Sequence, residues 1–272
     1  MRQPRRLLGL SACVLALGML LTACGGGGAT PPAAVSGSSG FAVDGYLNGA
    51  TVLCDVNGNG IADIGEATVG TDSGGFFKFT SACNAMMVAT GGTDTDTKQP
   101  FHGKLRAPAG SIVITPLTSL LAEGMTVDQV NTALGLPAGN DLKNTDPAVM
   151  VDGKLANPDL MRKTLALQQL VQQTTDVFAA LAGASGDAAK PAIYSEVMAA
   201  MASVLKTGVV LVSGTTFNQS VVVSMIKAAA DRVGASSVLS SEVRNGVKSV
   251  KDRKSTRLNS SHLRLSRMPS SA

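Results

Sequence analysis

The sequence of 272 residues contains no tryptophan, two tyrosines and only 3% aromatic residues overall. Proteins that hold single-stranded nucleic acids stack the bases on aromatic side chains, and this chain offers few such platforms. The formal net charge of +4 would still suit an anionic partner. However, this charge comes from the two ends of the chain, neither of which has the pattern of a folded domain.

Several catalytic sequence motifs are also absent. The chain contains no G-x-S-x-G elbow, no H-E-x-x-H, no phosphate-binding Walker loop and no dinucleotide-binding glycine fingerprint. The sequence therefore contains none of the usual motifs for acyl transfer, zinc proteolysis, nucleotide chemistry or hydride transfer. A carboxylate pair for glycoside cleavage needs no such motif, but nothing in the sequence suggests the large enclosing fold around it. We expect a protein that is not an enzyme.

The N-terminus has the pattern of an export signal. Arg2, Arg5 and Arg6 form a positive region, the apolar run Leu7–Leu21 is too short to span a bilayer with margin, and "LTAC" ends at Cys24. This pattern resembles a bacterial lipoprotein signal. The alternative is an ordinary cleaved signal with a chance cysteine.

The lipoprotein resemblance implies that residues 1–23 are removed and that Cys24 becomes an acylated N-terminus. Several acyl chains, at ~0.8 kcal/mol per buried methylene, hold such a protein firmly on a membrane. In that family, Gly25 after the cysteine, rather than Asp, implies export to the outer membrane. We expect a cell-envelope protein anchored through Cys24, with residues 24–40, rich in Gly, Ser and Pro, as a flexible tether.

The C-terminus resembles a translated sequencing adapter, in "DRKSTRLNSSH" and the later "SRMPSSA". We set residues 252–272 aside as an artefact and expect the natural protein to continue beyond Lys251. The signal holds three Lys/Arg, and the tail holds five Lys/Arg and one Asp, which leaves 15 basic and 18 acidic residues. The remainder is net negative without a basic cluster, so we expect no nucleic-acid partner.

Four cysteines are present. With Cys13 in the signal and Cys24 carrying lipid, Cys54 and Cys83 remain. An even pair in an exported chain is most simply a disulfide, and closing a loop of this length would stabilise the fold by ~3–4 kcal/mol. Two free thiols are the alternative.

The rest of the chain divides into two parts with different patterns. Residues 41–115 read as short strands between glycine turns, with Lys78 alternating between two phenylalanines, and they predict a small antiparallel β-sandwich. Residues 116–251 predict an all-α helical domain, so the expected fold class is α+β. The expected strands are "FAVDGYL", "ATVLC", "GFFKF", "MMVAT" and "SIVIT".

Helix signals are clear in the second part. Thr126 and Gln129 form a capping-box pair, and that helix should stop at Gly135. A second helix should start with Asn157 as its cap and Pro158 in its first turn. Its expected apolar stripe is Leu160, Leu167, Leu170, Phe178 and Leu181, and further helices are expected over residues 192–206, 217–233 and 237–251. Met198, Met201 and Met225 form a methionine-rich face, which is either buried core or an adaptable binding groove.

One loop carries a metal-binding pattern. In "CDVNGNGIADIGE", Asp55, Asn57, Asn59, Gly60, Asp63 and Glu66 fall on positions 1, 3, 5, 6, 9 and 12 of the calcium-loop pattern D-x-[DN]-x-[DN]-G-x5-E. Ca²⁺ takes six to eight hard oxygen ligands, and Gly60 permits the sharp bend that lets them converge. The predicted ligands are the side chains of Asp55, Asn57, Asn59, Asp63 and Glu66 and the backbone carbonyl of Ile61. The alternative is a plain hairpin turn with solvated acids.

The segment from Cys54 to Glu66 resembles the calcium-loaded B repeats of Gram-positive surface adhesins, in which such a loop joins two strands. The segment from Gly91 to Leu121 is similar to one that follows such modules in large proteobacterial surface proteins. The resemblance implies a structural calcium ion that stiffens an extracytoplasmic module, because a calcium sensor would need helices beside the loop. With only three carboxylates, we expect weak, millimolar-range affinity.

These patterns lead to one expected function and two rivals. We expect a lipid-anchored envelope protein that acts in surface architecture, adhesion or partner binding, with an envelope protein or surface ligand as partner. The first rival is a helical binding domain that uses the methionine-rich groove, with the sandwich as spacer. The second is a hydrolase that uses His102 with Asp94 and Asp96, for which a polar turn is the alternative.

Overall fold

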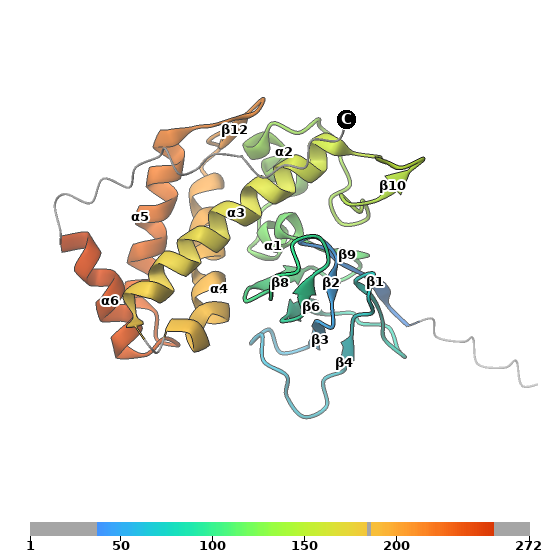
Figure 1. The fold of residues 1–272 in the computed structure, drawn as a ribbon, viewed down its shortest axis with the longest axis horizontal. Helices are drawn as coiled ribbons and strands as arrows, with labels where there is room; N and C mark the ends of the chain where they lie inside the picture. The colour runs from blue at the N-terminus through green and yellow to red at the C-terminus, as the bar shows by residue number, and fades with distance from the viewer. Residues whose placement is uncertain (1–36, 184–185, 253–272) are drawn as a thin grey trace, which may run out of the picture. The chain divides into compact units, whose positions relative to one another are not determined.

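The computed structural model of this chain describes residues 37–183 and 186–252. Strands form its first part, and helices with two short hairpins form the rest (Figure 1). The predicted signal, Cys24, most of the predicted tether and residues 253–272 lie outside the described residues. The strands before the first helix are β1 (Ser39–Ala42), β2 (Leu47–Asn48), β3 (Thr51–Asp55), β4 (Thr68–Gly70), β5 (Phe76–Lys78), β6 (Met86–Thr90), β7 (Thr93–Asp94), β8 (Lys104–Ala107) and β9 (Val113–Ile114).

Most of these strands belong to two small sheets. One sheet has the order β5-β1-β9 and the other β4-β3-β6-β8, while β2 pairs with β7. These pairs are antiparallel except that β1 and β9 run parallel. In the longest pair, β3 with β6, Cys54 lies opposite Met87 and Val52 opposite Ala89. The antiparallel strand region followed by helices confirms the predicted α+β class.

The buried face of β5 follows the predicted alternation. Phe77 and Phe79 are almost fully buried, whereas Phe76 and Lys78 are exposed. Because successive side chains of a strand point to opposite faces, this period of two places both buried rings on the same side of the sheet. Their rings meet edge to face, with centroids 5.8 Å apart. The alternation read from the sequence is therefore confirmed.

The second part is mainly helical and also contains two hairpins that the sequence analysis did not predict. In the described part of the chain, no helix combines the length and the apolar character needed to cross a bilayer. The helices are α1 (Pro116–Ala122), α2 (Val127–Leu134), α3 (Pro158–Leu181), α4 (Gly186–Leu205), α5 (Gln219–Ala235) and α6 (Ser241–Asp252). The hairpins are β10 (Met150–Val151) with β11 (Lys154–Leu155), and β12 (Val212–Ser213) with β13 (Thr216–Phe217).

Local sequence signals explain where α2 begins and ends. The Thr126 side chain accepts from the Gln129 backbone, and the Gln129 side chain accepts from the Thr126 backbone, as the capping box predicts. Gly135 ends the helix with a φ of 62°, a left-handed conformation that glycine adopts without strain. Both predicted signals are confirmed.

The long helix α3 matches its prediction at the start and differs from it at the end. It starts at Pro158 with Asn157 as its N-cap residue, as predicted, although the Asn157 side chain makes no capping hydrogen bond. Four predicted stripe residues are buried, namely Leu160, Leu167, Leu170 and Phe178. Leu181 is 38% exposed, because it lies in the last turn of the helix, where fewer elements pack around it. The predicted stripe therefore stops one turn earlier than expected.

One continuous cluster of buried apolar residues joins the strands to the helices. It includes Phe77 and Leu105 from the sheets and Leu167 and Tyr194 from α3 and α4. Phe101, in the loop before β8, meets the Tyr194 ring edge to face with centroids 6.0 Å apart. The strand region and the helical region thus share one core rather than two separate ones.

The methionine-rich face lies inside this core. Met198, Met201 and Met225 are each at most 1% exposed. Flexible, unbranched side chains fill irregular gaps between helices, which accounts for methionine at these positions. The prediction of buried core is confirmed, and the alternative of an open groove formed by these three residues is wrong.

A chain of buried polar groups also crosses from the strands to the helices. Gln168 of α3 donates to Asp44 Oδ2 at 2.9 Å, and Tyr194 of α4 donates to Gln168 Oε1 at 2.6 Å. Although part of Asp44 is exposed, its other oxygen, Oδ1, is buried without a hydrogen-bond partner. Burial, with a smaller contribution from the Asp94 carboxylate, raises the pKa of Asp44 well above its usual range, and the Gln168 hydrogen bond opposes this only partly. The folded state therefore favours a neutral Asp44.

This arrangement predicts how stability depends on pH. With its raised pKa, folded Asp44 retains a proton that the unfolded chain has released, so its contribution to stability falls as pH rises from the ordinary Asp pKa through the folded value. The Asp44→Asn variant keeps the shape without a charge and should be more stable above neutral pH by about 1–3 kcal/mol, with a flatter pH profile. Urea unfolding across pH measures this, with the exposed Asp231→Asn as control. Lower stability of Asp44→Asn at every pH would contradict it.

Candidate metal-binding loop

The loop with the calcium pattern leaves the sheet at the end of β3 and returns at β4, so it is flanked by strands (Figure 1). Asp55, at position 1 of the pattern, is the last residue of β3 and is only 2% exposed. The following positions 2 to 5 and 7 to 11 are exposed. The loop therefore has a buried base and a solvent-exposed tip.

The Asp55 carboxylate holds the first turn of the loop. Its Oδ1 accepts from the Gly58 backbone at 2.8 Å, and its Oδ2 accepts from the Gly60 backbone at 2.9 Å. Gly58 and Gly60 have φ angles of 77° and 71°, in the left-handed region that glycine tolerates best. The two glycines thus allow the backbone to bend around one carboxylate.

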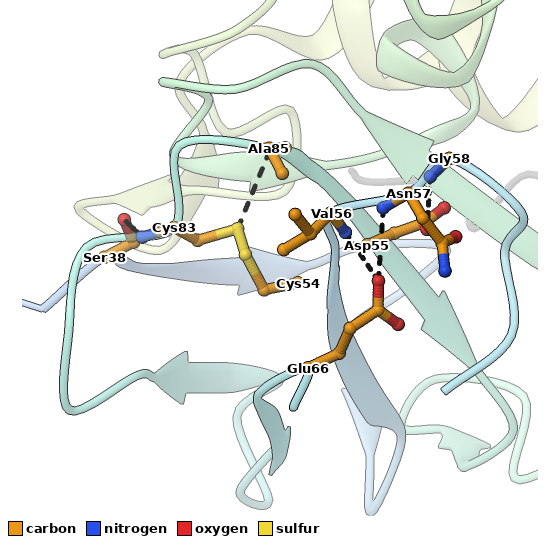
Figure 2. The surroundings of a disulfide bond; sticks show 9 residues. All are labelled: Ser38, Cys54, Asp55, Val56, Asn57, Gly58, Glu66, Cys83 and Ala85. Atoms are coloured by element: carbon orange, nitrogen blue, oxygen red, sulfur yellow. Dashed lines mark hydrogen bonds between the residues drawn. A yellow bond between two sulfur atoms is a disulfide. The ribbon is translucent and has the colours of Figure 1, made fainter. Parts of the chain in front are cut away.

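Glu66, at position 12, closes the loop from its other end. Its Oε1 accepts from the Val56 and Asn57 backbones at 2.7 and 3.2 Å, and its Oε2 accepts from the Asp63 backbone at 3.1 Å. Figure 2 shows the Glu66 side chain reaching toward the residues that follow Asp55. Both ends of the twelve-residue pattern are therefore tied together by a single carboxylate.

Three predicted ligand side chains meet at the middle of the loop. Asn57 and Asn59 both donate their Nδ2 groups to Asp63 Oδ2, at 2.7 and 2.6 Å. Their Oδ1 atoms accept backbone N–H groups two residues ahead, from Asn59 at 3.0 Å and Ile61 at 2.7 Å. The hydrogen bonds from the Asn57 and Asn59 amides lower the pKa of Asp63. Positions 3, 5 and 9 are thus brought together around an ionised carboxylate.

The loop offers calcium suitable donors, although not all of them converge. Across residues 37–183 and 186–252, no three His, Cys, Asp or Glu side chains gather closely enough to hold a metal ion. Here Asp55 and Glu66 accept backbone N–H groups, while Asp63 faces two amides. A half-turn of each Asn amide would present Oδ1 to Asp63, but it would also turn Nδ2 toward the Asn59 and Ile61 N–H groups that Oδ1 now accepts from. The residue types therefore suit calcium, whereas their present arrangement does not form a site for the ion.

A lysine that the sequence analysis missed lies against the loop. Lys104 of β8 donates from Nζ to the Gly60 carbonyl at 2.9 Å. Burial, with a smaller contribution from Arg106, lowers the pKa of Lys104, and the Asp55 carboxylate opposes that shift. The alternating "KLRA" pattern of β8 was the available signal, since Leu105 and Ala107 are buried while Lys104 and Arg106 face the other side. A protein cation therefore already compensates part of the negative charge of the loop.

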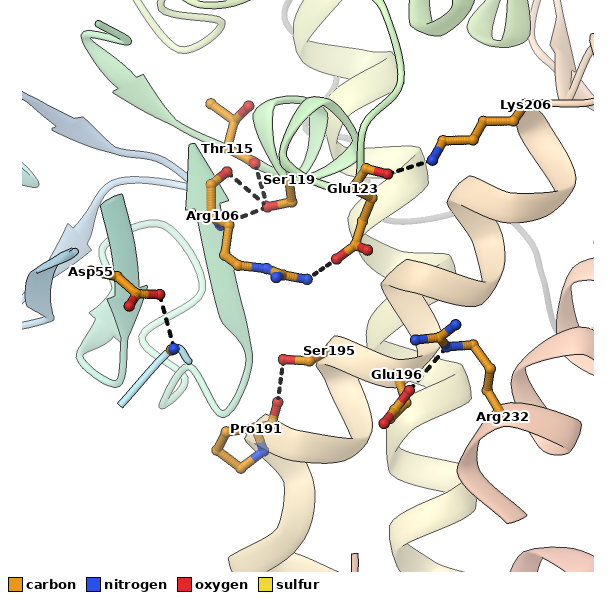
Figure 3. Close-up of polar contacts among 11 residues, drawn as sticks. Asp55, Arg106, Thr115, Ser119, Glu123, Pro191, Ser195, Glu196, Lys206 and Arg232 are labelled. Carbon is orange, nitrogen blue, oxygen red and sulfur yellow. Dashed lines mark hydrogen bonds and ion pairs between the residues drawn. The ribbon is translucent and has the colours of Figure 1, made fainter. Parts of the chain in front are cut away.

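Arg106 connects the base of the loop to the helices. Its guanidinium forms an ion pair with Glu123, which caps the C-terminal end of α1 (Figure 3). Burial lowers the pKa of Arg106, while the Asp55 and Glu196 carboxylates oppose this. Glu196 of α4 in turn accepts from Arg232 of α5 at 2.9 Å. The charge on Asp55 is therefore the first of a row of alternating charges that runs into the helical part.

The disulfide predicted between Cys54 and Cys83 is present and lies directly beside the loop (Figure 2). It joins the residue before Asp55 to a residue 29 positions later. The Cys83 backbone donates to Ser38 Oγ at 2.8 Å, so the first described residues of the chain are fixed at the same place. The alternative of two free thiols is wrong.

The chain has no matching relative to compare with this site. No protein-family model, curated protein or solved structure matches it. The interpretation of the loop therefore depends on its own geometry and on the sequence pattern.

In the second candidate site, His102 with Asp94 and Asp96, the two aspartates lie in a polar turn. Asp94 accepts from the Asp96 and Thr97 backbones with Oδ1, at 2.7 and 3.3 Å, and from the Thr97 hydroxyl with Oδ2, at 2.9 Å. His102 is exposed. Asp94 is thus occupied in shaping its own turn, which is the structural alternative that the sequence offered.

The disulfide beside the loop predicts a measurable loss of stability on reduction. Reducing the Cys54–Cys83 bond should lower the free energy of unfolding by about 3–4 kcal/mol, because the unfolded chain regains the conformational freedom that the disulfide removes. Urea unfolding of the protein with and without reductant measures the change. The double variant Cys54→Ser, Cys83→Ser should resemble the reduced protein and no longer respond to reductant. An unchanged unfolding midpoint on full reduction would contradict the prediction.

Proposed function

We propose that this protein is a lipid-anchored component of a bacterial cell envelope, in which a calcium ion stiffens the loop between β3 and β4. The role of the protein would be surface architecture, adhesion or the binding of an envelope protein or surface ligand. The observation that carries the calcium proposal is the meeting of Asn57, Asn59 and Asp63 at the spacing of a calcium loop.

The chemistry of the loop supports calcium over a plain turn. The two amides approach one ionised carboxylate oxygen, so a divalent cation would replace two N–H donors as the positive partner of Asp63. When bound, the ion would supply strong attraction for hard oxygens, and Asp55, Asn57, Asn59, Asp63 and Glu66 would hold it with the Ile61 carbonyl. With three carboxylates among these ligands, we expect millimolar-range affinity, which suits an extracytoplasmic setting where calcium is abundant.

The position of the loop supports a structural ion rather than a signalling one. Calcium sensors respond by changing the angle between two helices beside the loop. Here β3 and β4 flank the loop, and β3 lies inside the sheet with β4 on one side and β6 on the other. The disulfide fixes the same end of β3. An ion would therefore stiffen the tip and leave the rest of the fold unchanged.

The membrane anchor is proposed from the signal pattern that ends at Cys24, which lies outside the described residues. The disulfide agrees with an exported protein, because such bonds persist in oxidising compartments and are rare in the cytosol. In this proposal the acyl chains on Cys24 hold the protein on the bilayer. The folded part then faces the solvent of the envelope.

Calcium binding is tested on the whole mature protein in detergent. Calorimetric titration should detect binding, and calcium at about ten times its Kd should stabilise the fold by about 1.4 kcal/mol. Asp63→Ala removes the carboxylate at the centre of the loop and should weaken binding by at least about tenfold. Asp231→Ala, in the exposed face of α5, is the matched control and should bind as the wild type does. A folded wild-type protein with neither heat nor a stability change in calcium would exclude the site.

The anchor is tested separately in cells. Growth with a radioactive fatty acid should label the wild-type protein and place it in the membrane fraction. Cys24→Ala should abolish the label and release the protein from membranes, since the thiol that accepts the lipid is gone. The Cys54→Ser, Cys83→Ser double variant should keep its label, which distinguishes loss of lipid from loss of stability. An unlabelled wild-type protein would rule out the anchor.

A further inference from the structure

The loop between β3 and β4 contains two Asn-Gly pairs, a sequence that allows the chain to modify itself. Asn57 precedes Gly58 and Asn59 precedes Gly60, and both asparagines are exposed to water. Because glycine has no Cβ, its backbone nitrogen can approach the Cγ atom of the preceding asparagine without a steric barrier.

The reaction of such a pair is deamidation. The glycine nitrogen attacks Asn Cγ, the new C–N bond closes a cyclic imide, and the Cγ–Nδ2 bond breaks. Nδ2 leaves as ammonia and takes up the proton that the glycine nitrogen has lost. Water then opens the imide to aspartate or isoaspartate, so the reaction needs no other reagent.

One carboxylate oxygen holds both amide groups that would have to leave. Asp63 Oδ2 accepts from Asn57 Nδ2 at 2.7 Å and from Asn59 Nδ2 at 2.6 Å. The Oδ1 atoms of the same two amides accept from backbone N–H groups two residues ahead. An intramolecular attack requires a defined approach of the two reacting atoms, and an amide that is fixed at both of its ends seldom reaches it. Asp63 is therefore a shared restraint on two reactions.

The attacking nitrogens are restrained by a different carboxylate. Gly58 and Gly60 donate their backbone N–H groups to Oδ1 and Oδ2 of Asp55, at 2.8 and 2.9 Å (Figure 2). The glycine nitrogen attacks after losing its proton, and a negative charge beside a carboxylate is unfavourable. Each reaction is thus opposed at its nucleophile and at its leaving group.

The shared acceptor couples the two asparagines. Deamidation of Asn57 would place a new carboxylate against Asp63 Oδ2, where the Asn57 amide donates in the unmodified loop. Like charges in contact repel, so Asp63 would move away. The Asn59 amide would then lose its acceptor, and the same holds for Asn57 after deamidation of Asn59. The first conversion therefore releases the restraint on the second.

We propose that Asn57 and Asn59 form a self-modifying site in which Asp63 keeps both deamidations slow until one has occurred, after which the other follows faster. The inference goes beyond the proposed function and uses neither the membrane anchor nor a bound ion. The product is a loop with a carboxylate at each of the two positions. Because the ammonia is lost, the change is irreversible, and the negative charge of the loop increases with the age of the protein.

Isotope labelling measures each conversion in the whole protein. The protein is incubated with chelator in mildly alkaline heavy-oxygen water and is then mapped by mass spectrometry, so that only residues converted during the incubation carry the heavy oxygen. In the folded wild type, Asn57 and Asn59 should convert at least about tenfold more slowly than in the same chain in guanidinium chloride. Folded Asp63→Ala should convert at both asparagines at least about fivefold faster than the folded wild type. Asn48, which is exposed and precedes Gly49 at the opposite end of β3, is the internal control and should not respond to this variant.

The coupling is tested with Asn57→Asp, which reproduces the first conversion. It should raise the rate at Asn59 by at least about threefold. Asn57→Ser is the matched control, because its hydroxyl can still accept from the Asn59 backbone but adds no charge beside Asp63. In this control the rate at Asn59 should stay within about twofold of the wild-type rate.

Each contrary outcome overturns a distinct part of the proposal. No conversion at Asn57 or Asn59 in the folded or the unfolded chain overturns the site, and equal rates in both states overturn the restraint. An unchanged rate in folded Asp63→Ala overturns the role of Asp63. Urea unfolding verifies that each variant is folded, and Asp63→Asn, which keeps one acceptor oxygen in the same shape, should give an intermediate rate. Equal rates at Asn59 in Asn57→Asp and Asn57→Ser overturn the coupling. Because every incubation contains chelator, these results are independent of the calcium proposal.

Discussion

The Asp55 carboxylate is the group on which the loop and much of its surroundings depend. It is buried at the end of β3, and a buried charge is costly unless it has hydrogen-bond partners and opposite charges. The Gly58 and Gly60 backbones supply the partners, and Lys104 and Arg106 on β8 supply the charges. The hydrogen bonds of Asp55 therefore fix the path of the backbone at the base of the loop, while the side chains at its tip are exposed.

The same charges explain why the strand part and the helical part belong together. Arg106 forms an ion pair with Glu123 at the end of α1 and is attracted by the Asp55 carboxylate in the sheet. Lys206, just after α4, donates a hydrogen bond to the Glu123 carbonyl (Figure 3). Each of these pairs is partly exposed and contributes little on its own. They border a continuous apolar core, in which Phe101 and Tyr194 meet across the two parts. Stability comes mainly from that core, and the charges favour one relative arrangement of its two halves.

Patterns with a strong local cause were predictable from the sequence. The alternation around Lys78, the capping box of α2, the left-handed Gly135 and the disulfide each depend on a few neighbouring residues or on cysteine count. Strand β8 was missed because two basic residues, Lys104 and Arg106, interrupt its short apolar pattern. Their partners, the Gly60 carbonyl and Glu123, are distant in the sequence. Asn157 is the N-cap residue of α3 as predicted, but with ψ at 71° its side chain makes no hydrogen bond to the first turn. In the loop, three of the five side chains that the spacing predicted to converge, those of Asn57, Asn59 and Asp63, contact one another. The position of Lys104 against the loop depends on tertiary structure.

The parallel pairing of β1 with β9 has a consequence for biogenesis. Phe41 lies beside Val113, so one of the first strands to be synthesised acquires this neighbour only after some seventy further residues have emerged. Contacts between distant segments form slowly, because the intervening chain must be closed first. Until that closure, Phe77 and Leu105 lack their complete surroundings. The sheet that contains β1 can therefore be completed only late in synthesis, after the residues of β9 have emerged.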